Sequence, residues 1–200
     1  AAGALLDAMT VLIDRPAVPG LLAPLLAHCG SGDPDARTVV LANGLGFLTQ
    51  AYEATAGLIG NTLLALAARP DLGRQALGEP GVLNAIVWEV ARHDRPIQNT
   101  RRFLAAAAQV GGAAMRAGDA VLVVLAAANR DPAANPYPER FDPFRPRPTS
   151  FTFGLGPHAC PGEDLACTIA AAGVAEVLRL AVDVTPCLPD ARYRRSHNAR

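Results

Sequence analysis

A long helical pattern over residues 38–69 constrains the fold more than any other feature of this chain. The segment is predominantly apolar with helical spacing, and it ends at Pro70, whose ring and missing backbone donor stop a helix. About 30 residues at roughly 1.5 Å each make a rod of about 45 Å, long enough to cross a whole domain. Polar side chains interrupt it at Asn43, Gln50, Glu53 and Asn61. It therefore lacks the run of about 18 apolar residues that indicates a membrane span.

The remaining patterns predict a mainly α protein with a small β component. Shorter helices are expected over residues 71–77, 81–95 and 163–181. Short strands are expected between residues 103 and 124, with a turn at Gly111 and Gly112. A proline-rich meander follows over residues 129–148, and a last short strand is expected over residues 182–187. No internal repeat or flexible linker divides the chain, so residues 1–200 are expected to belong to one domain.

Composition narrows the class of protein. Hydrophobic residues make up 50% of the chain and its formal net charge is zero, so neither a basic patch nor an acidic tail indicates a nucleic-acid partner. The four cysteines have irregular spacing and give no disulfide framework. The first residues lack the basic region and long apolar core of a signal peptide. All 18 basic residues are arginine, which we interpret as a bacterial coding bias. These features favour a cytoplasmic protein with no membrane partner.

A cysteine closes a glycine-punctuated loop near the end of the chain. Within residues 150–162 the run FGLGPHACPG starts at Phe153 and holds the cysteine at position 160. Gly154 and Gly156 allow backbone conformations closed to other residues and a close approach to a flat ligand. The helix expected after Cys160 presents free N–H groups and a partial positive charge, which favour a thiolate over a thiol. The pattern predicts a metal-ligating thiolate.

Plainer interpretations compete with that prediction. A lone cysteine at a helix start is most often a small buried apolar residue. Zinc would need Cys and His at recognised spacings, and His158, Cys160 and Cys167 supply only three ligands. The loop as a whole, with its Phe, Gly, His and Cys in register, resembles the haem-binding loop of the cytochrome P450 family. The resemblance implies haem b as cofactor, Cys160 as the iron ligand, and Gly154 and Gly162 as residues that shape the haem site.

A second motif supports the resemblance. Glu89 and Arg92, in WEVARH, lie three residues apart on an expected helix, so their side chains share one face. Taken alone, such a pair is usually a surface ion pair worth roughly a few tenths of a kcal/mol. It is similar to the family's Glu-x-x-Arg pair, and Arg145, in PERFDPFR, stands where the family has a second arginine. A carboxylate between two planar guanidinium groups would form a rigid charge-assisted network. The segment AANRDP at 127–132 is also similar to a family segment, which implies a structural turn leading to the cysteine loop.

The resemblance implies further contacts with the haem. Arg102 occupies the register of the family's propionate-binding arginine, and Arg101 is an adjacent competitor that the sequence barely separates from it. His158 stands at the other position that contacts a propionate. Phe153 is expected to pack beside the sulfur and keep water away from it.

The long helix resembles the distal helix that crosses above the haem in this family, and Ala51 is among the small residues that would leave room for oxygen. The family has an acid followed at once by a threonine at the centre of this helix. Here Glu53 keeps the acid, Ala54 follows it, and Thr55 lies one residue further, about 100° around the helix. Either Glu53 with ordered water moves the protons, or the reaction needs no such relay, or oxygen activation is poor.

The resemblance extends over residues 20–185, the C-terminal half of the family's fold. It implies a monooxygenase that inserts one oxygen atom of O2 into a small organic substrate, with electrons from a ferredoxin or similar donor. An arginine-bearing surface near Arg145 and Arg147 would suit an acidic donor. Ala54 and the length of the chain favour an alternative, a catalytically inactive P450-like fragment or an auxiliary binding protein. A zinc or redox-thiol protein is a third hypothesis.

Overall fold

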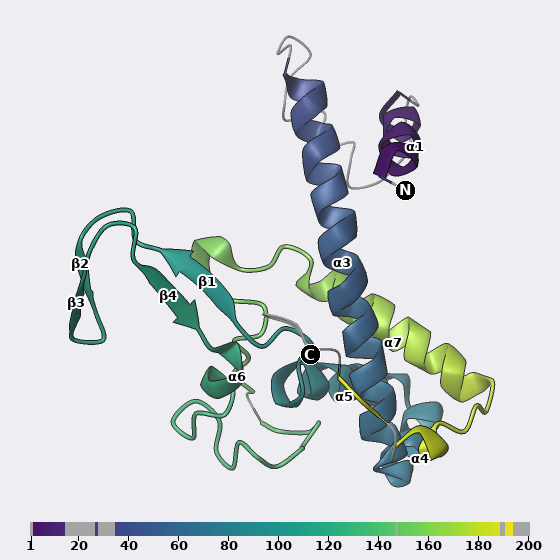
Figure 1. Ribbon diagram of the computed structural model, residues 1–200. Helices are drawn as coiled ribbons and strands as arrows, with labels where there is room; N and C mark the ends of the chain where they lie inside the picture. The colour runs from purple at the N-terminus through teal and green to yellow at the C-terminus, as the bar shows by residue number, and fades with distance from the viewer. Residues whose placement is uncertain (1, 15–26, 28–34, 147, 189–190, 194–200) are drawn as a thin grey trace. The chain divides into compact units, whose positions relative to one another are not determined.

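The computed structural model describes residues 2–14, 27, 35–146, 148–188 and 191–193. They fall into two compact units, residues 1–53 and 54–200, and the long helix α3 (Ala36–Ala67) begins in the first and ends in the second (Figure 1). Pro70 does not lie inside this helix but opens the next one, because the fixed φ of proline suits the first turn of a helix. Cys29 and Arg147 lie outside the described residues.

The first unit contains α1 (Ala2–Asp14) and the beginning of α3. Arg37 of α3 forms an ion pair with Asp14 at the end of α1, with Nη2 2.9 Å from Oδ2. The hydrogen bond from Arg37 lowers the pKa of the Asp14 carboxyl. Among the described residues of this unit, Met9 and Val40 have buried apolar side chains.

The second unit is built around three helices and the end of α3. These helices are α4 (Pro70–Gly78), α5 (Pro80–His93) and α7 (Glu163–Arg179). Helix α5 contacts both α4 and α7, and α4 also contacts α7. Helix α7 passes close to α3, since a Cβ added at Gly173 would lie 3.2 Å from Cδ1 of Ile59. The apolar faces of these helices form one core, which includes Leu58, Leu66, Ile86, Val87, Val90, Ala170 and Val174.

Two antiparallel strand pairs make up the β component. Strand β1 (Thr100–Phe103) pairs with β4 (Ala120–Val123), and β2 (Ala108–Val110) pairs with β3 (Ala113–Met115). Figure 1 shows β2 and β3 as a hairpin that continues from β1 and β4. Its turn is the predicted one: Gly111 and Gly112 have φ of 57° and 83°, a region that favours glycine. The predicted fold class, mainly α with a small β component, is confirmed.

Short elements complete the described chain. They are α6 (Leu125–Ala128), a 3-10 turn η1 (Gly156–His158) and a second 3-10 turn η2 (Thr185–Cys187). The strand predicted over residues 182–187 is wrong. The carboxylate of Asp183 accepts a hydrogen bond from the backbone N–H of Thr185 at 2.9 Å, and Pro186 cannot donate to a strand partner. Of the helices described, none combines the length and apolar character needed to cross a membrane.

Candidate functional site

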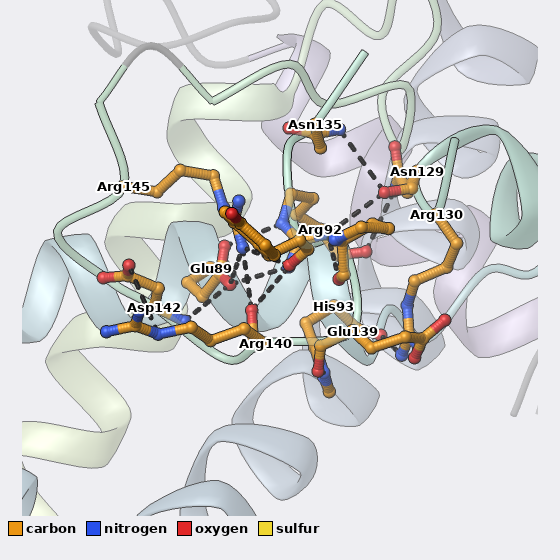
Figure 2. A network of polar contacts seen from close by, with 12 residues as sticks. Glu89, Arg92, His93, Asn129, Arg130, Asn135, Glu139, Arg140, Asp142 and Arg145 are labelled. Carbon is orange, nitrogen blue, oxygen red and sulfur yellow. Dashed lines mark hydrogen bonds and ion pairs between the residues drawn. The ribbon is translucent and has the colours of Figure 1, made fainter. Parts of the chain in front are cut away.

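A buried ion pair on α5 lies at the centre of a polar network (Figure 2). Glu89 and Arg92 are 4% and 0% exposed and share two hydrogen bonds, Nε to Oε2 at 2.8 Å and Nη2 to Oε1 at 2.7 Å. Arg92 also donates to the backbone carbonyls of Asn129 and Pro138 at 3.0 Å and of Arg140 at 3.3 Å. The guanidinium therefore ties α5 to the chain that follows α6.

Arg145 closes the other side of this network. Its side chain is only 7% exposed, and its Nη2 lies 3.9 Å from Oε1 of Glu89. It donates to the carbonyls of Pro136, of Tyr137 at 3.2 Å and of Arg140 at 2.8 Å. Tyr137 has a left-handed φ of 51°, so these bonds hold a backbone conformation that a tyrosine rarely adopts. The structure thus brings both arginines to the same carboxylate.

Two fully buried asparagines extend the network toward the cysteine loop (Figure 2). Asn135 donates from Nδ2 to the carbonyl of Thr149 at 2.8 Å and accepts at Oδ1 from the Thr149 N–H at 3.0 Å. Asn129 donates from Nδ2 to Oγ1 of Thr152 at 2.7 Å and accepts at Oδ1 from the Phe151 N–H at 2.6 Å. The chain that enters the cysteine loop is therefore held by side chains of the meander.

His93, next to the ion pair, is a half-buried residue of the same network. Its Nε2 lies 3.0 Å from the Glu139 carbonyl, and its ring meets the ring of Phe141 edge-on at 5.5 Å. Burial, with the positive charges of Arg130 and Arg92, lowers the pKa of His93 from 6.5 to about 4. The imidazole is therefore neutral at pH 7, and its Nε2–H donates to the carbonyl.

The cysteine loop is shaped by its own main chain. Gly154 and Gly156 have φ of 73° and 69°, as their place in the sequence predicts. The backbone N–H of Cys160 donates to the Phe153 carbonyl at 2.7 Å, which closes the loop just before α7. Helix α7 begins at Glu163 with Gly162 as its N-cap, so Pro161 precedes the helix. Cys160 is exposed at this point.

Two glycines of the loop lie close to other loop atoms, Gly154 more tightly than Gly162. A Cβ at Gly154 would lie 3.3 Å from the carbonyl oxygen of His158, and a Cβ at Gly162 would lie 3.9 Å from Sγ of Cys160. Phe153 is half-buried, and its ring meets Trp88 of α5 edge-on at 5.8 Å between centroids. An exposed soft thiol on a tight backbone turn suits a metal ion that takes one thiolate from the protein.

The second cysteine of α7 has a different environment. Cys167 is 5% exposed, and burial, followed by the negative charges of Glu163 and Asp164, raises the pKa of its thiol to about 12. It is therefore a neutral core residue at pH 7. Within the part of the chain that is described, no three His, Cys, Asp or Glu side chains gather in a way that could hold a metal ion. His158, Cys160 and Cys167 do not form the zinc cluster that the third hypothesis needs.

The arginines and the histidine predicted to hold propionates are exposed. Arg102 lies on β1, where its Nη1 donates to Oγ1 of Thr100 and to the carbonyl of Arg101, both at 2.8 Å. Neighbouring strand residues point to opposite faces, so only one of Arg101 and Arg102 can face any given ligand. His158 lies in η1, two residues before Cys160, and is exposed.

The candidate proton-transfer residues lie on α3. Ala51 and Glu53 are exposed, Ala54 is half-buried, and Thr55 is 6% exposed. Of the two groups that could move a proton, Glu53 is the one in direct reach of water. Thr55 is a buried residue, and its position on the helix differs from that of the neighbouring position 54 by about 100°.

Sequence reasoning missed several members of the network. Asn135, Thr152 and His93 carry no signal of their own, because their partners lie many residues away along the chain. Asn129 could be found, since it belongs to the segment AANRDP that was expected to close a turn. Its burial and the three hydrogen bonds of its side chain could not be read from that segment.

Three relatives place this arrangement among known proteins. The chain is 35% identical over 147 residues to the 20-oxo-5-O-mycaminosyltylactone 23-monooxygenase of Streptomyces fradiae, covering 74% of this chain and 35% of the relative. It is 36% identical over 148 residues to the vitamin D(3) 25-hydroxylase of Pseudonocardia autotrophica, covering 73% of this chain and 37% of the relative. The structure of cytochrome P450 CYP109Q5 from Chondromyces apiculatus matches 88% of this chain with a TM-score of 0.75 and 30% identity, over 47% of its own length.

The chain thus spans 35% and 37% of the length of these two relatives. The sequence model of the family described as Cytochrome P450 matches residues 40–180. This range contains Glu89, Arg92, Arg145 and Cys160, the residues on which the resemblance rests. It also covers more than half of the chain, and the chain therefore belongs to the cytochrome P450 family.

Proposed function

We propose that the protein to which this chain belongs is a haem-thiolate monooxygenase, with Cys160 as the iron ligand. It would insert one oxygen atom of O2 into a small organic molecule, using electrons from a redox partner. The observation that carries the proposal is the loop at Cys160, where two left-handed glycines and a main-chain hydrogen bond present an exposed thiol directly before α7. The relatives named as a 23-monooxygenase and a 25-hydroxylase support the same class of reaction.

The residues around Cys160 fit a haem. Gly154 approaches the His158 carbonyl too closely for a side chain to fit easily there, and the ring of Phe153 packs edge-on against Trp88. We assign His158 and Arg102 to the propionates, since both are exposed cations or hydrogen-bond donors at the positions the family uses. Bound haem, ligated by a thiolate, supplies the oxygen-activating chemistry. The chain itself would supply Cys160 as the iron ligand and His158 and Arg102 as hydrogen-bond donors to the propionates. Phe153 would shield the sulfur from water.

The role of the ion-pair network is structural in this proposal. Glu89, Arg92 and Arg145 are too buried to reach a substrate or a partner protein. They hold α5 against the meander, and the meander holds the start of the cysteine loop. Arg145 therefore does not offer the exposed positive charge that a ferredoxin would need, and the docking surface for an electron donor must use other residues.

Proton delivery is assigned to Glu53. It is exposed, so it can exchange protons with water, whereas Ala54 has no proton to give and Thr55 is buried. A general acid must lie within a hydrogen bond, or one water, of its target. We therefore expect Glu53→Gln to slow product formation more than Thr55→Val. Equal losses, or a larger loss for Thr55→Val, would move the assignment to Thr55.

The test of the proposal is the spectrum of the reduced protein with carbon monoxide. The 200-residue chain is expressed with haem supplied, reduced, and compared with and without carbon monoxide. A red-shifted Soret band, the signature of thiolate ligation, is the expected result. The variant Cys160→His should still bind haem but lose that band, and Cys167→Ala should keep it. A band of histidine-ligated or neutral-thiol haem in the unaltered chain would contradict the proposal.

A second candidate is a P450-like protein without catalytic activity. Ala54, at the place where the family has its threonine, is the observation that favours it. This candidate predicts the thiolate band but no oxidation of any substrate with a supplied ferredoxin and reductase. Ala54→Thr restores the family's acid–threonine pair and separates the two candidates most clearly. Activity gained only in that variant would identify the unaltered chain as inactive.

A further inference from the structure

The chain that leads into the cysteine loop is tied to α5 by side chains that no part of the proposed haem site explains. Asn129 and Asn135 are fully buried, and Thr152, which is half-buried, is bonded to both Asn129 and α5. We call these three residues the clasp. Asn129 uses both protons of its amide, donating to the Arg92 carbonyl at 3.1 Å and to Oγ1 of Thr152 at 2.7 Å. Its oxygen accepts from the Phe151 N–H at 2.6 Å, so both N–H groups and the oxygen of the amide have partners.

Thr152 carries the connection onward to α5. Its Oγ1 accepts from Asn129 and donates to the carbonyl of Ala91, one of the last carbonyls of that helix. Asn135 binds both backbone groups of Thr149, and its Nδ2 also reaches the carbonyl of Asn129 at 3.3 Å. Buried polar groups with a full set of partners specify one arrangement, because any shift leaves a donor or an acceptor unpaired.

The clasp ends where the cysteine loop begins. The Phe151 carbonyl accepts from the Gly154 N–H at 3.0 Å, and the Phe153 carbonyl accepts from the Cys160 N–H at 2.7 Å. A continuous series of hydrogen bonds therefore runs from the Arg92 carbonyl through Asn129 to Phe151 and the cysteine loop. The ion pair Glu89–Arg92 lies at the start of this series, since Arg92 also donates to the Asn129 carbonyl at 3.0 Å.

We propose that the clasp is a positioning element that fixes the cysteine loop, and with it the Cys160 thiol, relative to α5. It rests on the proposed function in so far as the positioned thiol is the haem ligand. The clasp residues touch no haem in this proposal; they act through the backbone of residues 149–153. An asparagine at position 129 is required because aspartate has no N–H to donate and would face the Arg92 carbonyl with a negative charge.

The decisive variants change single atoms of the clasp. Thr152→Val removes the hydroxyl but keeps the shape, and Thr152→Ser restores the hydroxyl. Asn129→Asp replaces the donating amide, and Asn84→Asp makes the same change at an exposed position on α5. The first measurement is amide hydrogen exchange in the chain without haem, resolved to peptides covering residues 149–160 and, separately, the core helices α5 and α7.

We expect Thr152→Val and Asn129→Asp to speed exchange in residues 149–160 about tenfold, the loss of one or two hydrogen bonds, with a smaller change in α5 and α7. Thr152→Ser and Asn84→Asp should match the unaltered chain. Exchange that is already fast at residues 149–160 in the unaltered chain would overturn the proposal. So would an equal increase in all helices, because that would show a contribution to overall stability and no specific hold on the loop.

The second measurement is the carbon monoxide difference spectrum of the haem-loaded chain. Thr152→Val and Asn129→Asp should convert part of the thiolate band into the band of a neutral or displaced thiol, and Thr152→Ser should not. An unchanged spectrum in both variants would overturn the link between the clasp and Cys160. If the unaltered chain gives no thiolate band, the proposed function fails, and the hydrogen-exchange result still decides whether the clasp holds the loop.

Discussion

The buried network on α5 and the cysteine loop are neighbours in the fold but are held in opposite ways. Around Arg92 the contacts are buried or partly buried, and side-chain charges meet backbone carbonyls from a distant part of the sequence (Figure 2). Residues 155–160 are all exposed, and the loop keeps its shape through its own turns and main-chain hydrogen bonds. We therefore expect substitutions in the network to affect stability more than substitutions of exposed side chains in the loop.

This difference separates two kinds of substitution. A change in the network leaves charges or hydrogen-bonding groups buried and unpaired, which is expensive. A change of an exposed side chain in the loop leaves nothing buried, so it alters what the loop can bind without altering whether the chain folds. Stability and ligand binding should therefore respond to different substitutions.

The largest effect is expected from Arg92→Ala. The variant leaves the Glu89 carboxylate buried without the closer of its two arginines. It also removes one donor from each of three backbone carbonyls, although those of Asn129 and Arg140 keep a second donor. Breaking a buried ion pair from one side costs about 3–5 kcal/mol, enough to unfold many domains. Urea denaturation followed by circular dichroism gives the free energy of unfolding.

The matched control for this prediction is Arg74→Ala. Arg74 also pairs with an acid three residues away, Asp71, but both side chains are largely exposed. Its loss should leave the denaturation midpoint almost unchanged. Similar losses for the two variants would show that the network is not the main support of this unit.

Gly154→Ala is expected to have the second-largest effect. Alanine at a φ of 73° is strained by roughly 1–2 kcal/mol, and its Cβ would also lie 3.3 Å from the His158 carbonyl oxygen. Gly156→Ala adds the same kind of strain at a φ of 69° with no atom within 4 Å of the new Cβ. The difference between the urea-denaturation midpoints of the two variants therefore measures the effect of the contact with the His158 carbonyl oxygen alone. If Gly156→Ala is as costly as Gly154→Ala, the packing inside the loop contributes nothing.

The same contrast explains what the sequence could predict. Glu89 and Arg92 were identified as a pair because a spacing of three places them on one helical face, and the loop was identified because its residues are contiguous. Arg145 was found only through the resemblance to the cytochrome P450 family. The match to the family model confirms that resemblance. Local patterns therefore predicted the helices, the hairpin turn and the presence of a thiol loop.

The parts that were missed depend on contacts between distant residues. Thr152 reaches Ala91 across 61 positions, and no spacing rule connects the two. The strand expected over residues 182–187 was wrong because the hydrogen bond from the Thr185 N–H to the Asp183 carboxylate favours a turn over the strand that the apolar pattern indicates. Burial was also invisible, so Arg145 was considered for a docking surface that its 7% exposure does not allow.

His93 is expected to make the stability of the network depend on pH. Its pKa is about 4 in the folded chain, against about 6.5 in an unfolded chain, because burial and the charges of Arg130 and Arg92 disfavour the imidazolium. The unfolded state binds the proton more readily, so stability is complete above about pH 6.5 and is lost progressively as the pH falls toward 4. We expect a loss of about 1 kcal/mol between pH 7 and pH 5, after allowing for solvent around a half-buried ring.

Urea denaturation at pH 7 and pH 5 tests this prediction. His93→Gln keeps a donor for the Glu139 carbonyl but has no titrating group, so it should lose less stability than the unaltered chain over this interval. His158→Gln, at an exposed position in the loop, should leave the pH dependence as it is. If His158→Gln instead changes how the free energy of unfolding depends on pH, the effect belongs to the cysteine loop. The network would then not be the main source of stability.

The smallest effect is expected at Cys160, the proposed haem ligand. Cys160 and Cys167 are seven residues apart, yet the first is exposed and the second is 5% exposed in the core. Cys160→Ser should leave the unfolding free energy of the haem-free chain unchanged within error, since the loop is closed by the backbone N–H of this residue and not by its sulfur. Cys167→Ser should cost about 1 kcal/mol, because it places a hydroxyl in an apolar environment. Denaturation curves of the two variants, measured side by side without haem, decide the matter. A clear loss of stability in Cys160→Ser would mean that the thiol supports the fold as well as a ligand, and that the loop and the network are not separable after all.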